Sequence, residues 1–171
     1  MKTWITADTH FGHEAIIHYC NRPFDSAAQM TDAMIRRWNE VVGENDVVWH
    51  LGDFGFGHKD QMTKWLDLLN GKKKLIKGNH ERHANQWYRD VGFSEVYDKP
   101  IIAYDFIIFS HLPIEIINED SVFGNIYGHI HNDERYKTVT SHTACVSVER
   151  WNYTPIELDP LLKQMKALGL V

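Results

Sequence analysis

The sequence is poor in cysteine and contains no long apolar run. Only Cys20 and Cys145 occur among 171 residues, too few for a disulfide framework, and they favour a reducing, cytosolic setting. No stretch approaches the roughly 18 apolar residues of a membrane span, and the first residues lack the pattern of a signal peptide. We therefore expect a cytoplasmic protein that has no membrane partner.

An excess of positive charge is also missing. The 18 Lys and Arg stand against 23 Asp and Glu, and a net charge of −5 argues against a nucleic-acid binder that relies on overall charge. It does not exclude a phosphate substrate held by metal. Repeats, linkers and low-complexity segments are absent, so residues 1–171 are expected to form a single domain.

Histidine is the residue type present in excess. Its 11 copies outnumber the 7 Tyr and the 6 Trp, and they do not form a run at either end of the chain. Hydrophobic residues make up 43% of the chain, enough for a substantial core, which excludes a disordered, collagen-like or coiled-coil protein. The histidines therefore indicate a metal site within a globular fold.

Short apolar runs predict strands, and two amphipathic stretches predict helices between them. The expected strands are Thr3–Ala7, Val47–Leu51, Lys74–Ile76, Tyr104–Phe109, Asn125–Tyr127 and Ala144–Val148. The expected helices are Ser26–Val42, Lys59–Asn70 and a closing helix with Asp159 as N-cap and Pro160 as its first residue. The lysines Lys72–Lys74 are expected in a solvated turn. The chain is thus α/β in its first half and rich in β-strands in its second.

Polar residues follow nearly every predicted strand. The blocks are Asp8-Thr9-His10, Gly52-Asp53, Gly78-Asn79-His80-Glu81, Ser110-His111 and Gly128-His129-Ile130-His131. The three glycines are consistent with tight turns out of the strands, which let the backbone approach a ligand. Because ligands collect at the carboxyl ends of strands in α/β sheets, the five blocks are expected to converge on one site.

Seven of these residues form a ligand set for two divalent metal ions: Asp8, His10, Asp53, Asn79, His111, His129 and His131. Imidazole nitrogen mixed with carboxylate and amide oxygen suits Mn, Fe, Ni or Zn, and we expect no thiolate nearby to demand a softer metal. Asp53, in the middle of the series, is the expected bridging ligand. Two such ions clamp the attacking and leaving oxygens of an in-line displacement, which is phosphoryl chemistry.

The order of the five blocks resembles the calcineurin-like metallophosphoesterase superfamily, in particular its small bacterial and phage members. The resemblance implies an α/β fold in which two mixed β-sheets pack as a sandwich flanked by helices. It implies one ion bound by Asp8, His10, Asp53 and His131, and the other by Asp53, Asn79, His111 and His129. His80 would protonate the leaving group or stabilise the phosphate. Two departures from the family pattern are Glu81, where aspartate is common, and Leu112, where many members have glycine.

The expected function is hydrolysis of phosphate esters by in-line attack of a hydroxide activated at the two ions, with Mn as the first choice of metal. The catalytic residues would be His80, as general acid, and Asp53. Asn79, Arg82 and His13 are candidates for substrate contact, and Glu81 is a candidate for orienting His80. The compact chain favours an open cleft and a diester, including a nucleotide or nucleic acid.

Three alternatives remain open at this point. The same site could act on phosphomonoesters or as a nuclease, or the fold could serve as a metal-stabilised binding module without catalysis. The segment from His129 to Asp133 also resembles the metallo-β-lactamase motif, but position 134 is Glu rather than His and the segment comes late in the chain. The metallo-β-lactamase resemblance is a further alternative and the weaker enzyme interpretation.

Overall fold

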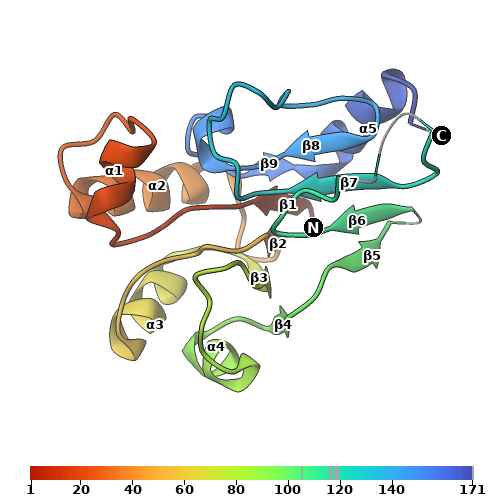
Figure 1. Cartoon of the computed structure of the whole chain (residues 1–171). Coiled ribbons are helices and arrows are strands. Elements are labelled where there is room, and N and C mark those ends of the chain that lie inside the picture. Colours follow the sequence, from red (N-terminus) through yellow and green to blue (C-terminus); the bar gives the residue numbers. More distant parts are fainter. Residues whose placement is uncertain (105, 116, 118–119, 171) are drawn as a thin grey trace.

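The computed structural model describes residues 1–104, 106–115, 117 and 120–170, and within them the chain forms two β-sheets (Figure 1). The first sheet has the strand order β4-β3-β2-β1-β9. Its strands are β1 (Thr3–Thr6), β2 (Val47–His50), β3 (Lys72–Ile76), β4 (Glu95–Tyr97) and β9 (Ile156–Glu157). Strands β1 to β4 are mutually parallel and β9 runs antiparallel to β1, so the sheet is mixed.

The second sheet has the order β5-β6-β7-β8 and is also mixed. Its strands are β5 (Ile101–Ala103), β6 (Ile107–Phe109), β7 (Gly124–Tyr127) and β8 (Thr143–Cys145), and only the β5–β6 pair is antiparallel. The strand predicted over Tyr104–Phe109 is shorter than expected, and residue 105 lies outside the described residues. Two mixed sheets with flanking helices confirm the predicted fold class.

Side chains of the first sheet alternate between two hydrophobic clusters. One cluster joins the sheet to the helices that precede β4 in the chain, and the other joins it to the second sheet and to the last helix. Trp4, Val48 and Leu75 belong to the first cluster. Their chain neighbours Ile5, Trp49 and Ile76 belong to the second. This period of two is what a strand buried on both faces requires, and it places the sheets face to face.

The helices are α1 (Glu14–Tyr19), α2 (Ala27–Val41), α3 (Lys59–Leu68), α4 (Asn85–Val91) and α5 (Leu158–Ala167), with a 3-10 helix η1 (Val148–Trp151). At the start of α2, the N-cap residue Ser26 accepts a side-chain hydrogen bond from the Gln29 backbone. At the end of α3, the Lys73 ammonium donates to the carbonyls of Leu66 and Leu69, at 3.0 and 2.8 Å. No helix in the described part of the chain combines the length and apolar character needed to cross a membrane.

Two local predictions are wrong. Helix α5 begins at Leu158 with Glu157 as its N-cap residue, so Asp159 and Pro160 lie inside the first turn. That turn has no intrahelical partners for its N–H groups, so proline is tolerated there.

The lysines Lys72–Lys74 begin strand β3 instead of a turn. Lys74 pairs with Glu95 at 3.0 Å on the neighbouring strand, which explains how the charges are accommodated.

Candidate metal centre

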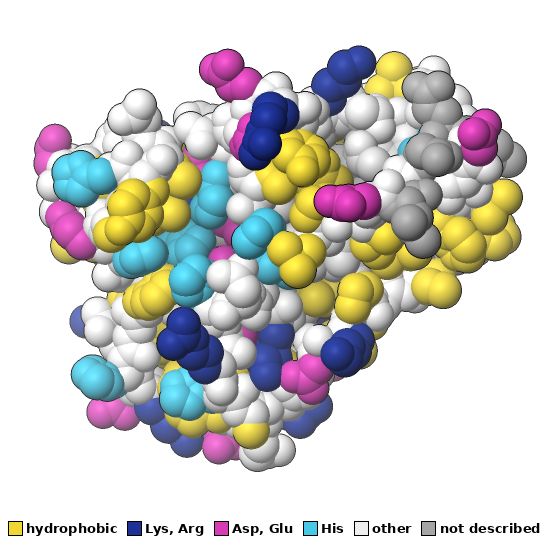
Figure 2. Space-filling model, viewed as in Figure 1, with side chains coloured by type: hydrophobic (Ala, Val, Ile, Leu, Met, Phe, Trp, Pro, Cys, Tyr) yellow, Lys and Arg dark blue, Asp and Glu magenta, His cyan; other side chains and the backbone are white. Residues whose placement is uncertain are grey.

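The predicted site residues follow directly on five strand ends. Asp8 and His10 come after β1, Asp53 after β2, Asn79 and His80 after β3, His111 after β6, and His129 and His131 after β7. Strands β1 to β3 are parallel neighbours, and so are β6 and β7, so these loops share one edge of the sandwich. Figure 2 shows histidine side chains gathered at one place on the molecular surface.

The first donor cluster consists of Asp8, His10 and His131, whose ligand atoms lie within 4.8 Å of one another. Asp8 and His10 are buried, with exposed fractions of 0% and 1%. One carboxylate oxygen of Asp8, Oδ2, accepts hydrogen bonds from the His129 backbone and the Ser147 hydroxyl. The other oxygen, Oδ1, and His10 Nε2 are buried without a hydrogen-bond partner among the described residues. Such orphaned atoms are costly unless a cation satisfies them.

The second donor cluster consists of Asp53, His111 and His129, again within 4.8 Å. His111 Nε2 lies 3.2 Å from His129 Nδ1, 3.4 Å from Asp53 Oδ2 and 3.0 Å from Asn79 Oδ1. Its other ring nitrogen, Nδ1, lies 2.8 Å from the carbonyl oxygen of Leu51, a bond that turns Nε2 toward the cluster. Nitrogen and oxygen donors pointing at a common centre suit a borderline divalent metal.

Asp53 connects the two clusters. Its Oδ2 lies 3.4 Å from His111 Nε2 and 3.7 Å from His10 Nε2, so one carboxylate oxygen faces both. Its Oδ1 accepts a hydrogen bond of 3.0 Å from the backbone N–H of His80. The residue predicted to bridge two ions therefore lies between the two clusters, and the residues present fit a dinuclear centre.

Burial and neighbouring charge set the protonation of the donors. Burial lowers the pKa of His10 to about 2, so its imidazole is neutral, the form that binds metals. Burial raises the pKa of Asp8. Although burial opposes it, the hydrogen bond and charge of His111 lower the pKa of Asp53. Burial likewise opposes the shift of His111, but the hydrogen bond to Asp53 and the charges of Asp8 and Asp53 raise its pKa to about 9.

Five of the seven predicted ligands have left-handed backbone conformations. The φ angles are 60° at Asp8, 50° at His10, 57° at Asp53, 71° at His129 and 48° at His131. Non-glycine residues adopt positive φ uncommonly, and such strain persists only where the surrounding structure enforces it. Its concentration on the ligands marks these loops as a functional site.

The glycines of the predicted blocks allow the loops to touch. A Cβ atom added at Gly52 would lie 2.6 Å from both the Gly78 nitrogen and His111 Nδ1. One added at Gly128 would lie 2.6 Å from Asp8 Oδ2. Gly52 also has a φ of 93°, as a tight turn requires, whereas Gly128 matters through close approach alone.

Two charged residues behind His131 carried no sequence signal. His131 Nδ1 lies 2.8 Å from Glu149 Oε1, and the same oxygen accepts a hydrogen bond of 2.6 Å from the Arg22 guanidinium. Arg22 also donates to the backbone carbonyls of Asp8 and Thr9, at 2.7 and 2.9 Å. This buried pair therefore fixes the His131 ring and the loop after β1 together.

The expectation that no thiol lies near the site is wrong. Cys20, which is buried and free, forms a third donor group with His131 and Glu149 within 4.8 Å. The chain folds back here, because Cys20 follows α1 while the other two residues lie more than 100 positions later. Although burial opposes the shift, hydrogen bonds to Cys20 and Glu149 raise the pKa of His131 to about 11. The Arg22 cation already neutralises Glu149, so this group is a poor cation site.

Glu81 does not orient His80. Its carboxylate accepts hydrogen bonds from the backbone N–H groups of Asp53, Phe54 and Gly78, at 2.8, 2.9 and 2.7 Å. A glutamate reaches these amides from the loop after β3, where it ties that loop to the loop after β2. Its role is thus to hold the backbone of the bridging residue.

The predicted acid His80 lies at the edge of the centre, and two of the predicted substrate-contact residues, His13 and Arg82, are its neighbours. His80 Nε2 lies 3.9 Å from Asp53 Oδ2, and its side chain is 32% exposed. His13 Nδ1 lies 3.3 Å from His10 Nδ1, and the His13 ring stacks on Phe56 with centroids 4.1 Å apart. Arg82 is exposed in the loop before α4 and shares a pocket with His80.

Comparison with known proteins decides the family. Residues 1–166 match the family model described as calcineurin-like phosphoesterase. The chain belongs to this family. Its members hydrolyse phosphoester bonds and typically bind divalent metal ions, so the resemblance seen in the sequence blocks is confirmed. Curated relatives and solved structures that resemble the phosphoesterase include the following four proteins.

An uncharacterised protein of Methanocaldococcus jannaschii is 32% identical over 95% of this chain and 90% of its own length. The gene 66 protein of Mycobacterium phage L5 is 31% identical over 75% of this chain and 59% of its own length. A protein of unknown function from Aquifex aeolicus shares the fold with a TM-score of 0.72 and 26% identity, over 95% of this chain and 98% of the other. The Pseudomonas putida nuclease MPE has a TM-score of 0.51 and 23% identity, over 75% and 61%, which shows the fold alone.

Proposed function

We propose that the phosphoesterase is a dinuclear metal-dependent phosphodiesterase whose single domain spans the chain. The observation that carries this proposal is the position of Asp53 Oδ2 between His10 and His111, with unpartnered Asp8 Oδ1 and His10 Nε2 close by. Both buried cysteines are free, which is compatible with the cytoplasmic setting proposed for it.

The seven ligands divide as the clusters do. Asp8, His10 and His131 would hold one ion, Asn79, His111 and His129 the other, and Asp53 would bind both. Bound divalent ions supply Lewis acidity and lower the pKa of a coordinated water toward roughly 7. Mn is the first candidate, with Fe, Ni and Zn as the alternatives, because the donors mix imidazole nitrogen with oxygen.

His80 is proposed as the proton donor to the leaving group. Its imidazole stands at the rim, and hydrogen bonding of its backbone N–H to Asp53 Oδ1 fixes it beside the bridging carboxylate. It would transfer a proton from Nε2 to the departing oxygen, so that an alkoxide need not leave unprotonated. A 32% exposed side chain can regain that proton from solvent.

Room for two substituents on phosphorus favours a diester. A pocket of about 630 Å³ adjoins His80, and a separate pocket of about 540 Å³ adjoins His129. A phosphate between the clusters could send one substituent into each, whereas a monoester would use only one. A nucleic acid is the biological diester we favour, and the fold shared with a chain named as a nuclease is in keeping with it.

The test is turnover of bis(p-nitrophenyl) phosphate and p-nitrophenyl phosphate by metal-free protein to which Mn, Fe, Ni or Zn is returned. We expect Mn-dependent hydrolysis that is faster for the diester. Asp53→Asn should remove it, while Asp159→Asn, the same change at an exposed position on α5, should leave it intact. If metal binds but neither ester is hydrolysed, the non-catalytic binding module replaces the enzyme.

A further inference from the structure

The pocket beside His80 is built from four segments of the chain. The loop after β2 supplies Phe56, the start of α3 supplies Gln61, the loop after β3 supplies His80 and Arg82, and α4 supplies Trp87. His80 belongs both to this pocket and to the rim of the metal centre. If His80 protonates the leaving oxygen, then the group attached to that oxygen must extend into this pocket.

Flat rings from two separate segments of the chain line the pocket. The His83 and Trp87 rings are stacked, with centroids 4.2 Å apart and planes inclined by 19°. From the other segment, the Phe56 ring is 39% exposed and lies 4.9 Å from the His80 ring. Partly exposed rings of this kind are surfaces on which a nucleobase stacks, whatever its identity.

Charge separates this pocket from its counterpart beside His129. The described residues that line it include Arg82 but neither Asp nor Glu. The other pocket includes Glu115 and Asp133, and its Arg135 is already paired with Asp133 at 2.6 Å. A leaving group that carries a further phosphate is therefore better accommodated beside Arg82.

We propose that the pocket formed by Phe56, His83 and Trp87 is a nucleotide subsite that stacks the base of the leaving group, with Arg82 binding its phosphate. This proposal rests on the proposed function, since His80 defines which side the leaving group takes. A volume of about 630 Å³ lies within the usual range of small-ligand sites. The base, and not only the ester, thereby contributes to recognition.

The experiment compares adenosine 5′-monophosphate with ribose 5-phosphate, which lacks only the base. Each is titrated into the Mn-loaded protein by calorimetry and, separately, used to inhibit hydrolysis of bis(p-nitrophenyl) phosphate. We expect the nucleotide to bind about 10-fold more tightly, because base stacking adds to phosphate binding. Trp87→Ala should reduce that ratio to about 1, and Trp87→Phe should retain most of it.

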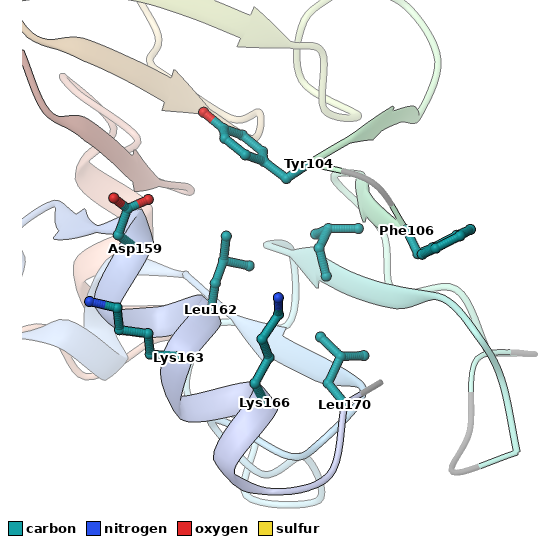
Figure 3. Close-up of a pocket in the computed structure, with 8 residues that line it drawn as sticks. Tyr104, Phe106, Asp159, Leu162, Lys163, Lys166 and Leu170 are labelled. Carbon is teal, nitrogen blue, oxygen red and sulfur yellow. The ribbon is translucent and has the colours of Figure 1, made fainter.

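The matched control is Phe106→Ala, which removes an aromatic ring that is 54% exposed and belongs to a different pocket, across from α5 (Figure 3). It should leave the ratio unchanged. Equal affinity of the two ligands for the unaltered protein overturns the nucleotide subsite, even if the diester is hydrolysed. Absence of metal-dependent hydrolysis overturns the proposed function instead, and calorimetry still reports whether the base is recognised. His83→Ala, at an exposed position, serves if Trp87→Ala fails to fold.

Discussion

The two donor clusters differ in what surrounds them. Asp8 and His10 are almost fully buried, and the Arg22–Glu149 pair supports His131 from behind. In the second cluster Asp53 and His111 are also buried, but His129 lines a pocket and the neighbouring predicted ligand Asn79 is exposed. We therefore propose that the first cluster would retain its ion and that the second would present one to substrate. Two clusters with the same number of ligands can therefore bind their ions with different affinities, because burial and supporting residues determine how firmly each ion is held.

The largest expected effect comes from removing His10. We expect His10→Ala to lower the affinity for the first ion at least about 100-fold, because the first cluster then loses a buried, neutral imidazole ligand. Mn titration should then show one binding step where the unaltered protein shows two. Two steps with unchanged affinities would contradict the assignment of the first cluster.

Glu149→Gln should selectively lower the affinity for the first ion. Substitution of residues that support metal-bound histidines typically lowers metal affinity by about 10- to 100-fold. Glutamine keeps the shape of the glutamate but loses the charge that holds His131. The second ion should be unaffected. The control is Glu134→Gln, the same change at an exposed position. Thermal melting should be measured for both variants, because Glu149→Gln also removes the charged partner of the buried Arg22 and should lower stability.

The pH dependence of metal binding should also differ between the clusters. In the metal-free protein His111 has a pKa of about 9 and His131 of about 11, so each holds a proton at pH 7.5. An ion must displace that proton, so affinity should rise about 10-fold per pH unit for each site below the pKa. Above about pH 9, the rise should stop for the second ion and continue for the first. Calorimetry with Mn between pH 7 and 10, in buffers of different ionisation enthalpy, measures both the affinity and the proton release.

Asn79→Ala should have the smallest effect. A neutral amide oxygen on an exposed loop contributes less than a charged or buried ligand, and we expect about 10-fold weaker binding of the second ion. The first ion then serves as the internal reference within the same titration. Loss of the first ion as well would show that the clusters are not separable in this way.

The convergence of the ligands was predictable because it follows from strand order. Asp8, Asp53 and His111 each stand just beyond a short apolar run, and the carboxyl ends of parallel strands share one edge. Strand order therefore predicts that these side chains come together, whereas the two-sheet fold was predicted from the family resemblance. Asp53 was predicted to bridge two ions because it is the acidic residue in the middle of the series, and its Oδ2 lies between His10 and His111, at 3.7 and 3.4 Å.

The supporting residues were not predictable from one sequence. Arg22 and Glu149 are 127 positions apart and belong to no recognisable pattern, so only folding brings them together. Glu81 had a signal, its place beside His80, but its carboxylate satisfies three backbone amides instead. Short elements such as β4 and β9 also escape periodicity, because two or three residues do not define a repeat.

Asp8 makes the phosphoesterase a case of the trade-off between stability and function. It combines a φ of 60°, a carboxylate without exposure and an orphaned oxygen, each of which opposes folding of the metal-free chain. Asparagine tolerates the left-handed conformation and carries no charge. Asp8→Asn is thus a substitution that selection for stability alone would favour, and binding of the proposed metal ion would give the aspartate its advantage.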